Sequence, residues 1–170
     1  MRVAPRPPRL QASRPWSSDR VIRLAGFRLQ HLEQLYLIES EVFGVDCYQR
    51  ECFEKLCLDN QNLLLVARQK DRVVGYAMGE WKRDGAEVVS LAVDAAFQGR
   101  GIGKALLQAL LARFVQAGAQ KAFLMVRTDN DNAISLYSRL GFRRIRKVDC
   151  YYMDGQAAYR MRLQLPVYGS

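Results

Sequence analysis

The chain is poor in the residues on which metal sites and histidine-dependent catalysis depend. It has one histidine, His31, and four cysteines, Cys47, Cys52, Cys57 and Cys150. One histidine cannot supply a histidine-rich metal site, and steps of five residues between cysteines match no zinc-binding spacing. His31 also forms no coherent motif with a serine or a cysteine, so nucleophilic catalysis is not indicated. We expect no metal, and we interpret the cysteines as reduced thiols of a cytoplasmic protein.

Long apolar runs are missing as well. No run approaches the length of a membrane span, and the first residues lack the apolar segment of a secretory signal. Four of the five prolines lie in residues 1–20, together with five arginines and a single acid. This composition predicts a disordered arm, with a transit peptide as the minor alternative. Residues 21–170 are long enough for a single domain with a substantial core.

Acidic residues are outnumbered by basic ones. The formal net charge is +9, of which residues 1–20 carry +4. The remaining +5 comes without a long run of lysine and arginine inside the domain. A basic surface attracts anions of any kind, whether phosphorylated ligands, nucleic acids or acidic proteins. Since the charge discriminates among none of these, we do not expect direct nucleic-acid binding, and an RNA-associated protein is the weaker hypothesis.

The most informative stretch is the glycine-rich turn at residues 98–104, Gln-Gly-Arg-Gly-Ile-Gly-Lys. A strand-like apolar run precedes it at 88–93, and a helical run rich in alanine and leucine follows at 105–116. Such a turn exposes backbone N–H groups at a helix start, where they and the helix dipole favour a phosphate. The Walker and Rossmann spacings both fail, because other residues occupy positions at which these motifs require glycine. The spacing that remains is Gln-x-x-Gly-x-Gly.

Hydrophobic periodicity predicts a mixed α/β domain. The predicted order is a strand, two helices, three strands, a helix, a strand, a helix and two final strands. The run at 122–126 is apolar on both faces, which predicts a buried strand parallel to a neighbour. We therefore expect a mixed central sheet of about six to seven strands with helices on both faces. The predicted strands are residues 21–24, 63–68, 72–81, 87–93, 122–126, 142–148 and 159–165, and the predicted helices are residues 30–43, 47–58, 102–117 and 132–140.

The glycine-rich turn and two later patterns resemble the GNAT acetyltransferase superfamily, whose acetyl-CoA loop also follows a strand and opens a helix. The second pattern is Val126-Arg127-Thr128-Asp129-Asn130, followed by residues 133–137 and by Leu140-Gly141-Phe142. The third is Tyr151-Tyr152-Met153-Asp154-Gly155 with residues 158–161. This tail is similar to that of the ribosomal-protein-alanine acetyltransferases and related protein N-terminal acetyltransferases. The resemblance covers roughly residues 20–165 and implies the GNAT fold.

The resemblance implies roles for the loop and its surroundings. Loop N–H groups would hold the CoA pyrophosphate, and the preceding strand would pair with the pantetheine arm and polarise the thioester carbonyl. Asn130 matches an asparagine near the pantetheine, and it equally fits a helix cap. Tyr137 matches the tyrosine that protonates the departing thiolate, although a core tyrosine would occupy the same helical stripe. The implied cofactor-binding residues are Leu91, Ala92, Val93, Gln98, Gly99, Arg100, Gly101, Ile102, Gly103, Lys104, Asn130 and Tyr137.

The catalytic base is where the chain departs from the resemblance. An attacking amine must lose a proton, and the alanine acetyltransferases carry a glutamate where this chain has Met125. Glu87 lies eleven residues before Gln98, which resembles the base position of the histone acetyltransferases, and it equally fits an exposed residue at a strand start. We predict that Glu87 and Tyr137 are catalytic. The predicted acceptor-binding residues are Glu41, which is also the weaker candidate for the base, Phe43, Tyr151 and Tyr152.

Together these residues predict an N-acetyltransferase that uses acetyl-CoA and no metal. The acetyl group would pass to a primary amine by direct attack, without a covalent enzyme intermediate. The preferred acceptor is a protein N-terminal α-amine, for instance that of a ribosomal protein, and a lysine side chain or a small amine is the alternative. A non-catalytic acetyl-CoA-binding module is a hypothesis of another class, which Met125 keeps open. We expect a monomer or weak dimer without membrane association.

Overall fold

The computed structural model describes residues 21–166, so the arm predicted at residues 1–20 lies outside the described part. Helices and strands follow one another in the predicted order. The first two helices begin two and three residues later than predicted, because a short turn precedes each of them. The elements are β1 (Ile22–Gly26), α1 (Leu32–Phe43), α2 (Arg50–Leu58), β2 (Leu63–Gln69), β3 (Arg72–Lys82), β4 (Gly85–Val93), α3 (Ile102–Gln116), β5 (Lys121–Arg127), α4 (Asp131–Arg139), β6 (Arg143–Val148) and β7 (Ala158–Gln164).

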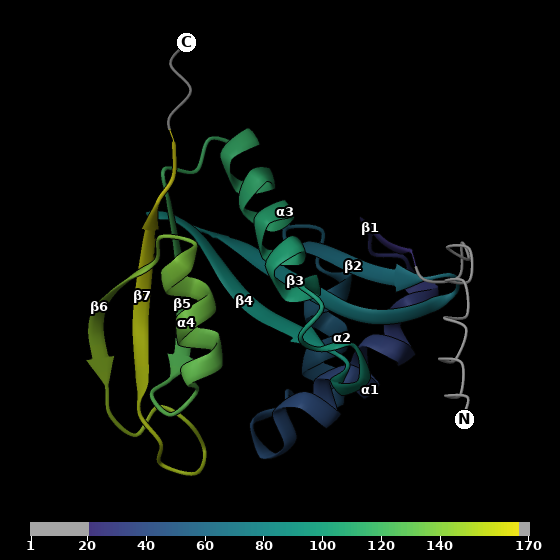
Figure 1. The fold of residues 1–170 in the computed structure, drawn as a ribbon, viewed down its shortest axis with the longest axis horizontal. Helices are drawn as coiled ribbons and strands as arrows, with labels where there is room; N and C mark the ends of the chain where they lie inside the picture. The colour runs from purple at the N-terminus through teal and green to yellow at the C-terminus, as the bar shows by residue number, and fades with distance from the viewer. Residues whose placement is uncertain (1–20, 167–170) are drawn as a thin grey trace, which may run out of the picture.

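Within residues 21–166 the strands form one mixed sheet of seven, in the order β1-β2-β3-β4-β5-β7-β6. Strands β4 and β5 are parallel, which confirms the parallel neighbour expected for residues 122–126. The other neighbouring strands are antiparallel. The chain therefore forms a meander from β1 to β4, crosses over through α3, and ends in the β7–β6 pair at the far edge (Figure 1).

The parallel pair in the middle of the sheet comes apart after three residues. Residues Ala86–Val88 of β4 pair with Ala122–Leu124 of β5, and the pairing ends there. Beyond that point β4 remains paired with β3 as far as Val93, while β5 remains paired with β7 as far as Arg127. The two strands diverge visibly in Figure 1. This separation opens the centre of the sheet, and the candidate site lies there.

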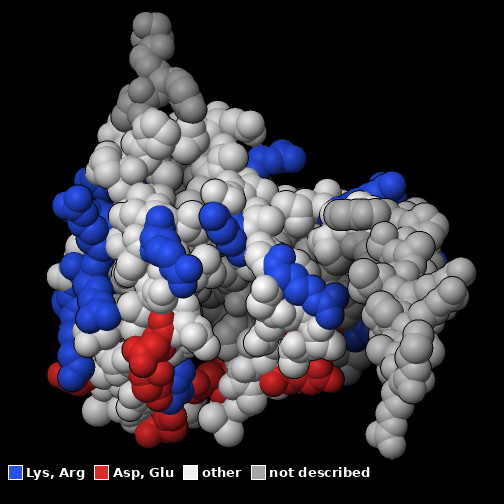
Figure 2. Space-filling view, viewed as in Figure 1, with Lys and Arg blue, Asp and Glu red and all other residues white. Residues whose placement is uncertain are grey.

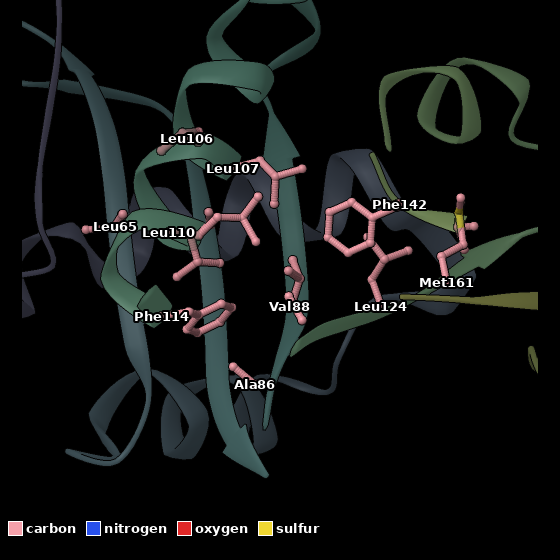
Figure 3. Packing of buried hydrophobic residues seen from close by; sticks show 14 of the residues in the cluster. Leu65, Ala86, Val88, Leu106, Leu107, Leu110, Phe114, Leu124, Phe142 and Met161 are labelled. Atoms are coloured by element: carbon pink, nitrogen blue, oxygen red, sulfur yellow. The ribbon is translucent and has the colours of Figure 1, made fainter. Parts of the chain in front are cut away.

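Helices cover both faces of the sheet. Helices α3 and α4 lie on the face toward the viewer in Figure 1, and α1 and α2 lie behind the sheet. The front core joins α3 to side chains from β2, β4, β5 and β7 (Figure 3). The rear core joins α1 and α2 to β2, β3 and β4. No helix within residues 21–166 is long and apolar enough to cross a membrane.

Helix α3 packs so closely on β3 that one position in the strand has no room for a Cβ unless a neighbour shifts. A Cβ at Gly79 would lie 2.9 Å from Phe114 Cε1 and closer still to Phe114 Cζ. Phe114 is fully buried and belongs to the stripe on α3 that the 3.6-residue period predicts. The tight contact holds α3, and with it the glycine loop at its N-terminus, at a defined height above the sheet.

Candidate active site

A cleft of about 560 Å³ lies where β4 and β5 diverge. Its walls come from the strands β3, β4 and β5, from the end of α1 and the segment that follows it, and from α4 and the β6–β7 loop. The lining residues are Glu39, Phe43, Asp46, Tyr48, Glu80, Lys82, Glu87, Val88, Val89, Ser90, Leu91, Leu124, Met125, Tyr137, Tyr151, Tyr152 and Met153.

The glycine loop forms the N-terminus of α3. Gly99 and Gly101 have φ angles of 73° and 78°, a left-handed conformation that glycine adopts without strain, and Gly101 occupies the N-cap position. A Cβ at either glycine would meet no atom of residues 21–166 within 4 Å, so among these residues the loop backbone is open to a ligand. The first turn of α3 carries no acid and includes Lys104. Loop and helix therefore present N–H donors and positive charge to an anion.

Several loop residues have structural partners of their own. The Gln98 side chain donates to the backbone carbonyl of Val93 at 3.0 Å, which ties the loop to the end of β4. The Arg100 guanidinium donates to the carbonyl of Ala96 at 2.8 Å. Ile102 is buried in the front core, so only its backbone is available to a ligand. Gly103 packs against Val93, where an added Cβ would lie 3.6 Å from Cγ2.

Strand β4 presents its backbone to the cleft. Its pairing with β3 shifts between Met78 and Gly79, which leaves Val89 as the extra residue of a β-bulge. On the side toward β5, the described strands offer no pairing partner to residues 89–93. Leu91 lines the cleft, whereas the Ala92 side chain is buried in the rear core. Free N–H and C=O groups along a separated strand can pair with an extended ligand.

The cleft is acidic. Among residues 21–166, four carboxylates line it, those of Glu39, Asp46, Glu80 and Glu87, against a single cation, Lys82. Lys82 Nζ lies 2.5 Å from Glu80, and Asp46 forms an ion pair with Arg127. Glu87 is half-buried, and within residues 21–166 it has no hydrogen-bond or ion-pair partner. An unpaired carboxylate in such a cleft can bind an ammonium group and can accept its proton.

Glu39 forms the buried floor of the cleft. Its side chain accepts hydrogen bonds from Tyr76 Oη and from the backbone N–H of Tyr48, the latter at 3.1 Å, and Ser90 Oγ lies 3.4 Å away. Burial raises the pKa of Glu39, and the hydrogen bonds oppose this only in part. Sequence reasoning missed Glu39, although its spacing from Leu35 and Ile38 places it on the buried face of α1.

Tyr137 lines the cleft from α4 and packs edge to face against Phe142. Burial raises the pKa of Tyr137 to about 12, so the phenol keeps its proton at neutral pH and can donate it. Asn130 is the N-cap of the same helix, and its side chain accepts a hydrogen bond from Ala133 N at 3.0 Å. The structure thus shows Asn130 in the capping role, which is one of the two roles that the sequence left open. The other is binding of the cofactor.

The structure brings most of the predicted acceptor residues together. Phe43, Tyr151 and Tyr152 line the cleft with Met125, and the sequence missed Tyr48 and Met153 beside them. Glu41 is exposed and does not line the cleft. It follows Glu39 by two residues, and on a helix this spacing places the two side chains on roughly opposite faces.

One side chain joins the two loops at the rim of the cleft. Arg127, at the end of β5, forms ion pairs with Asp46 after α1 and with Asp154 in the β6–β7 loop, the latter at 2.6 Å. It also pairs with Asp129 at 3.2 Å, and its guanidinium lies 4.8 Å from the centre of the Tyr152 ring. These contacts tie the two loops together at the rim.

Comparison with known proteins agrees with this geometry. Residues 29–142 match the acetyltransferase (GNAT) family model. N-alpha-acetyltransferase RimI of Mycobacterium tuberculosis is 38% identical over 131 residues, which cover 74% of this chain and 81% of RimI. An uncharacterized protein of Mycobacterium leprae is 40% identical over 131 residues, which cover 74% of this chain but only 36% of that longer protein.

A solved structure has the same architecture. The ribosomal-protein-S18-alanine N-acetyltransferase from Escherichia coli superposes with a TM-score of 0.80 at 26% identity, covering 88% of this chain and 97% of that one. The chain therefore belongs to the GNAT acetyltransferase family, and it is an acyltransferase with the GNAT fold.

Proposed function

We propose that this acyltransferase moves an acetyl group from acetyl-CoA to the α-amine at a protein N-terminus. The observation that carries the proposal is the Glu87 carboxylate, which has no hydrogen-bond or ion-pair partner in the described part of the chain and lies in an acidic cleft where the parallel strands diverge. The names of the relatives, N-alpha-acetyltransferase RimI and ribosomal-protein-S18-alanine N-acetyltransferase, support an N-terminal acceptor.

The residues present fit acetyl-CoA. The open N–H groups of residues 99–104 suit its pyrophosphate, with Lys104 adding positive charge. The free backbone edge of β4 beyond Val88 suits an amide-bearing arm that lies along the strand. Bound in this way, acetyl-CoA would supply the acyl group as a thioester next to the cleft.

The acceptor arrives at neutral pH as an ammonium ion, which has no lone pair for attack. The acidic cleft attracts this cation, and Glu87 takes one of its protons, directly or through a water molecule. Met125 lies in the same cleft but has no group that can accept a proton. Glu87 is therefore the base that we assign, and the buried Glu39, already bonded to three donors, serves to hold the walls of the cleft.

Two groups act on the acyl transfer itself. A backbone N–H of β4 near the bulge at Val89 donates to the carbonyl oxygen as negative charge develops there. The protonated Tyr137 phenol donates its proton to the thiolate as the C–S bond breaks, and the second proton lost by the attacking nitrogen replaces the one that the phenol gives up. The amine attacks directly, and no enzyme nucleophile is needed. Membership of an acyltransferase family also argues against a binding module without turnover.

The test is the release of CoA with a panel of acceptors: peptides with a free N-terminus, among them that of a ribosomal protein, N-terminally blocked lysine peptides, and polyamines. We expect turnover with free N-termini alone. The Glu87→Gln variant should lose about 10²–10⁴-fold in kcat/KM while acetyl-CoA binding is retained. Glu51→Gln is the matched control, because Glu51 is an exposed carboxylate on α2 outside the cleft.

Two results would contradict the proposal. Equal rates for wild type and Glu87→Gln would show that Glu87 is not the base. Turnover confined to blocked lysine peptides or polyamines would show that the acceptor class is wrong, with the chemistry intact.

A further inference from the structure

A row of charged residues crosses the rear face of the sheet, and strand register sets its order. Glu80 on β3 pairs with Glu87 on β4, and Glu87 pairs with Phe123 on β5. Phe123 pairs with Arg162 on β7, which in turn pairs with Arg143 on β6. Residues that pair directly point to the same face of a sheet. The row therefore runs from two carboxylates in the cleft, over one aromatic ring, to two arginines at the sheet edge.

A second arginine pair lies beside the first. Arg146 on β6 pairs with Arg160 on β7, and a register shift between Arg144 and Arg146 makes room for one extra residue. Positions 143 and 146 would point to opposite faces of a regular strand, and the irregularity brings both to the rear face. We call Arg143, Arg146, Arg160 and Arg162 the arginine quartet.

The arginine quartet has no anionic partner within residues 21–166. Three of its members are exposed, and Arg160 is half-buried with its guanidinium 4.9 Å from the centre of the Phe123 ring. Like charges directly opposite each other on neighbouring strands destabilise a sheet unless an anion lies between them. Figure 2 shows lysine and arginine gathered along the β6 edge on the viewer's face as well. Arginine forks bind carboxylates through two parallel hydrogen bonds.

From these contacts we propose that the acceptor carries acidic side chains at about its fourth and fifth residues, and that the arginine quartet binds them. This inference rests on the proposed function, because it places the acceptor amine at Glu87. Strands lie about 4.8 Å apart, so Arg162 is about 10 Å and Arg143 about 14 Å across the sheet from Glu87. An extended peptide advances about 3.3 Å per residue and covers these distances in three to four steps.

An acidic acceptor accounts for the arrangement better than a nucleic-acid backbone does. The quartet shares one face with the carboxylates of the cleft, and Arg143 and Arg162 also share their row, so a ligand that follows the row meets both charges. A peptide with a cationic N-terminus and acidic residues further on matches both ends of the row. A phosphate backbone matches only the quartet and is repelled by Glu80 and Glu87.

The experiment compares octapeptides that differ only at positions four and five, with glutamate, glutamine or lysine there. We expect kcat/KM for the glutamate peptide to exceed that for the glutamine peptide about tenfold, mainly through KM, and the advantage should shrink as salt is added. The ratio should fall to about one in the Arg143→Gln/Arg162→Gln variant. It should persist in Arg23→Gln/Arg113→Gln, which removes the same charge from exposed sites on β1 and α3.

A second measurement separates this inference from the proposed function. Fluorescently labelled versions of the same peptides, titrated in the presence of CoA, report binding even if no peptide is acetylated. A quartet-dependent preference for glutamate in that titration upholds the inference whatever the turnover. Equal binding of the glutamate and glutamine peptides overturns it. It is overturned too if the quartet variant leaves the peptide ratio unchanged but loses affinity for a labelled single-stranded RNA.

Discussion

Replacing Glu39 with alanine should lower the free energy of unfolding by a measurable amount. Glu39 is 1% exposed and accepts hydrogen bonds from Tyr76 Oη and the Tyr48 backbone N–H. Alanine leaves the Tyr48 N–H without an acceptor, at about 1–3 kcal/mol, whereas Tyr76 Oη keeps Ser90 Oγ, 2.9 Å away, as a partner. The alanine variant no longer buries a carboxylate, and the free energy that this burial costs the wild type offsets part of the loss. We expect a net loss of about 1–3 kcal/mol, against a total stability of about 5–15 kcal/mol for a typical domain.

Glutamine at the same position separates shape from charge. It keeps the volume and one carbonyl oxygen, so it should cost less than alanine at every pH. Burial raises the pKa of Glu39 above its ordinary value of 4.5, so the folded protein holds this proton to a higher pH than the unfolded chain does. Between the two pKa values the folded state binds more protons, and the free energy of unfolding falls as the pH rises.

Wild type should therefore lose stability relative to Glu39→Gln as the pH rises from 4.5 through the raised pKa, and the difference should then level off. The slope cannot exceed about 1.4 kcal/mol per pH unit for one group. Urea denaturation followed by circular dichroism, from about pH 4 to about pH 8, measures both effects. The reasoning is refuted if alanine costs less than about 1 kcal/mol, or if the difference between wild type and Glu39→Gln does not change with pH.

Two further perturbations test the packing and the rim of the site. Gly79→Ala should destabilise the fold by about 1–3 kcal/mol in the same denaturation assay, because its Cβ would overlap the Phe114 ring. Adding Phe114→Leu should recover part of the loss, and a purely additive double variant would contradict this account. Arg127→Gln should raise KM for the acceptor about tenfold while leaving acetyl-CoA affinity unchanged, because the two rim loops lose their common partner. Arg139→Gln is its control, since the hydrogen bonds of Arg139 stay within α4; equal KM values for the two variants would show that the ion pairs do not position the loops.

The order of elements and the glycine loop could be predicted because their signals are local. A helical stripe recurs every three to four residues and a strand alternates every two, so each is visible in a short window of sequence. The Gln-x-x-Gly-x-Gly spacing carries its own backbone requirement, which Gly99 and Gly101 meet with positive φ angles. The parallel strand at residues 122–126 followed from its two apolar faces.

The acid on α1 was less well predicted. Resemblance favoured Glu41, whereas the helix turns Glu39 toward the cleft and leaves Glu41 exposed. Helical phase was in the sequence, but the partners that make a buried carboxylate tolerable, Tyr76 and Ser90, come from strands far along the chain. A buried acid without such partners would be too costly to expect.

Local sequence thus determined the helices, the strands and the anion-binding turn between β4 and α3. These elements define the class to which the protein belongs. Tertiary structure alone decided which charges share a surface. The separation of β4 from β5, the bulge at Val89 and the irregularity between Arg144 and Arg146 set the register of the strands. A slip of one residue would move a side chain to the opposite face, and register depends on contacts between distant segments that no short window contains.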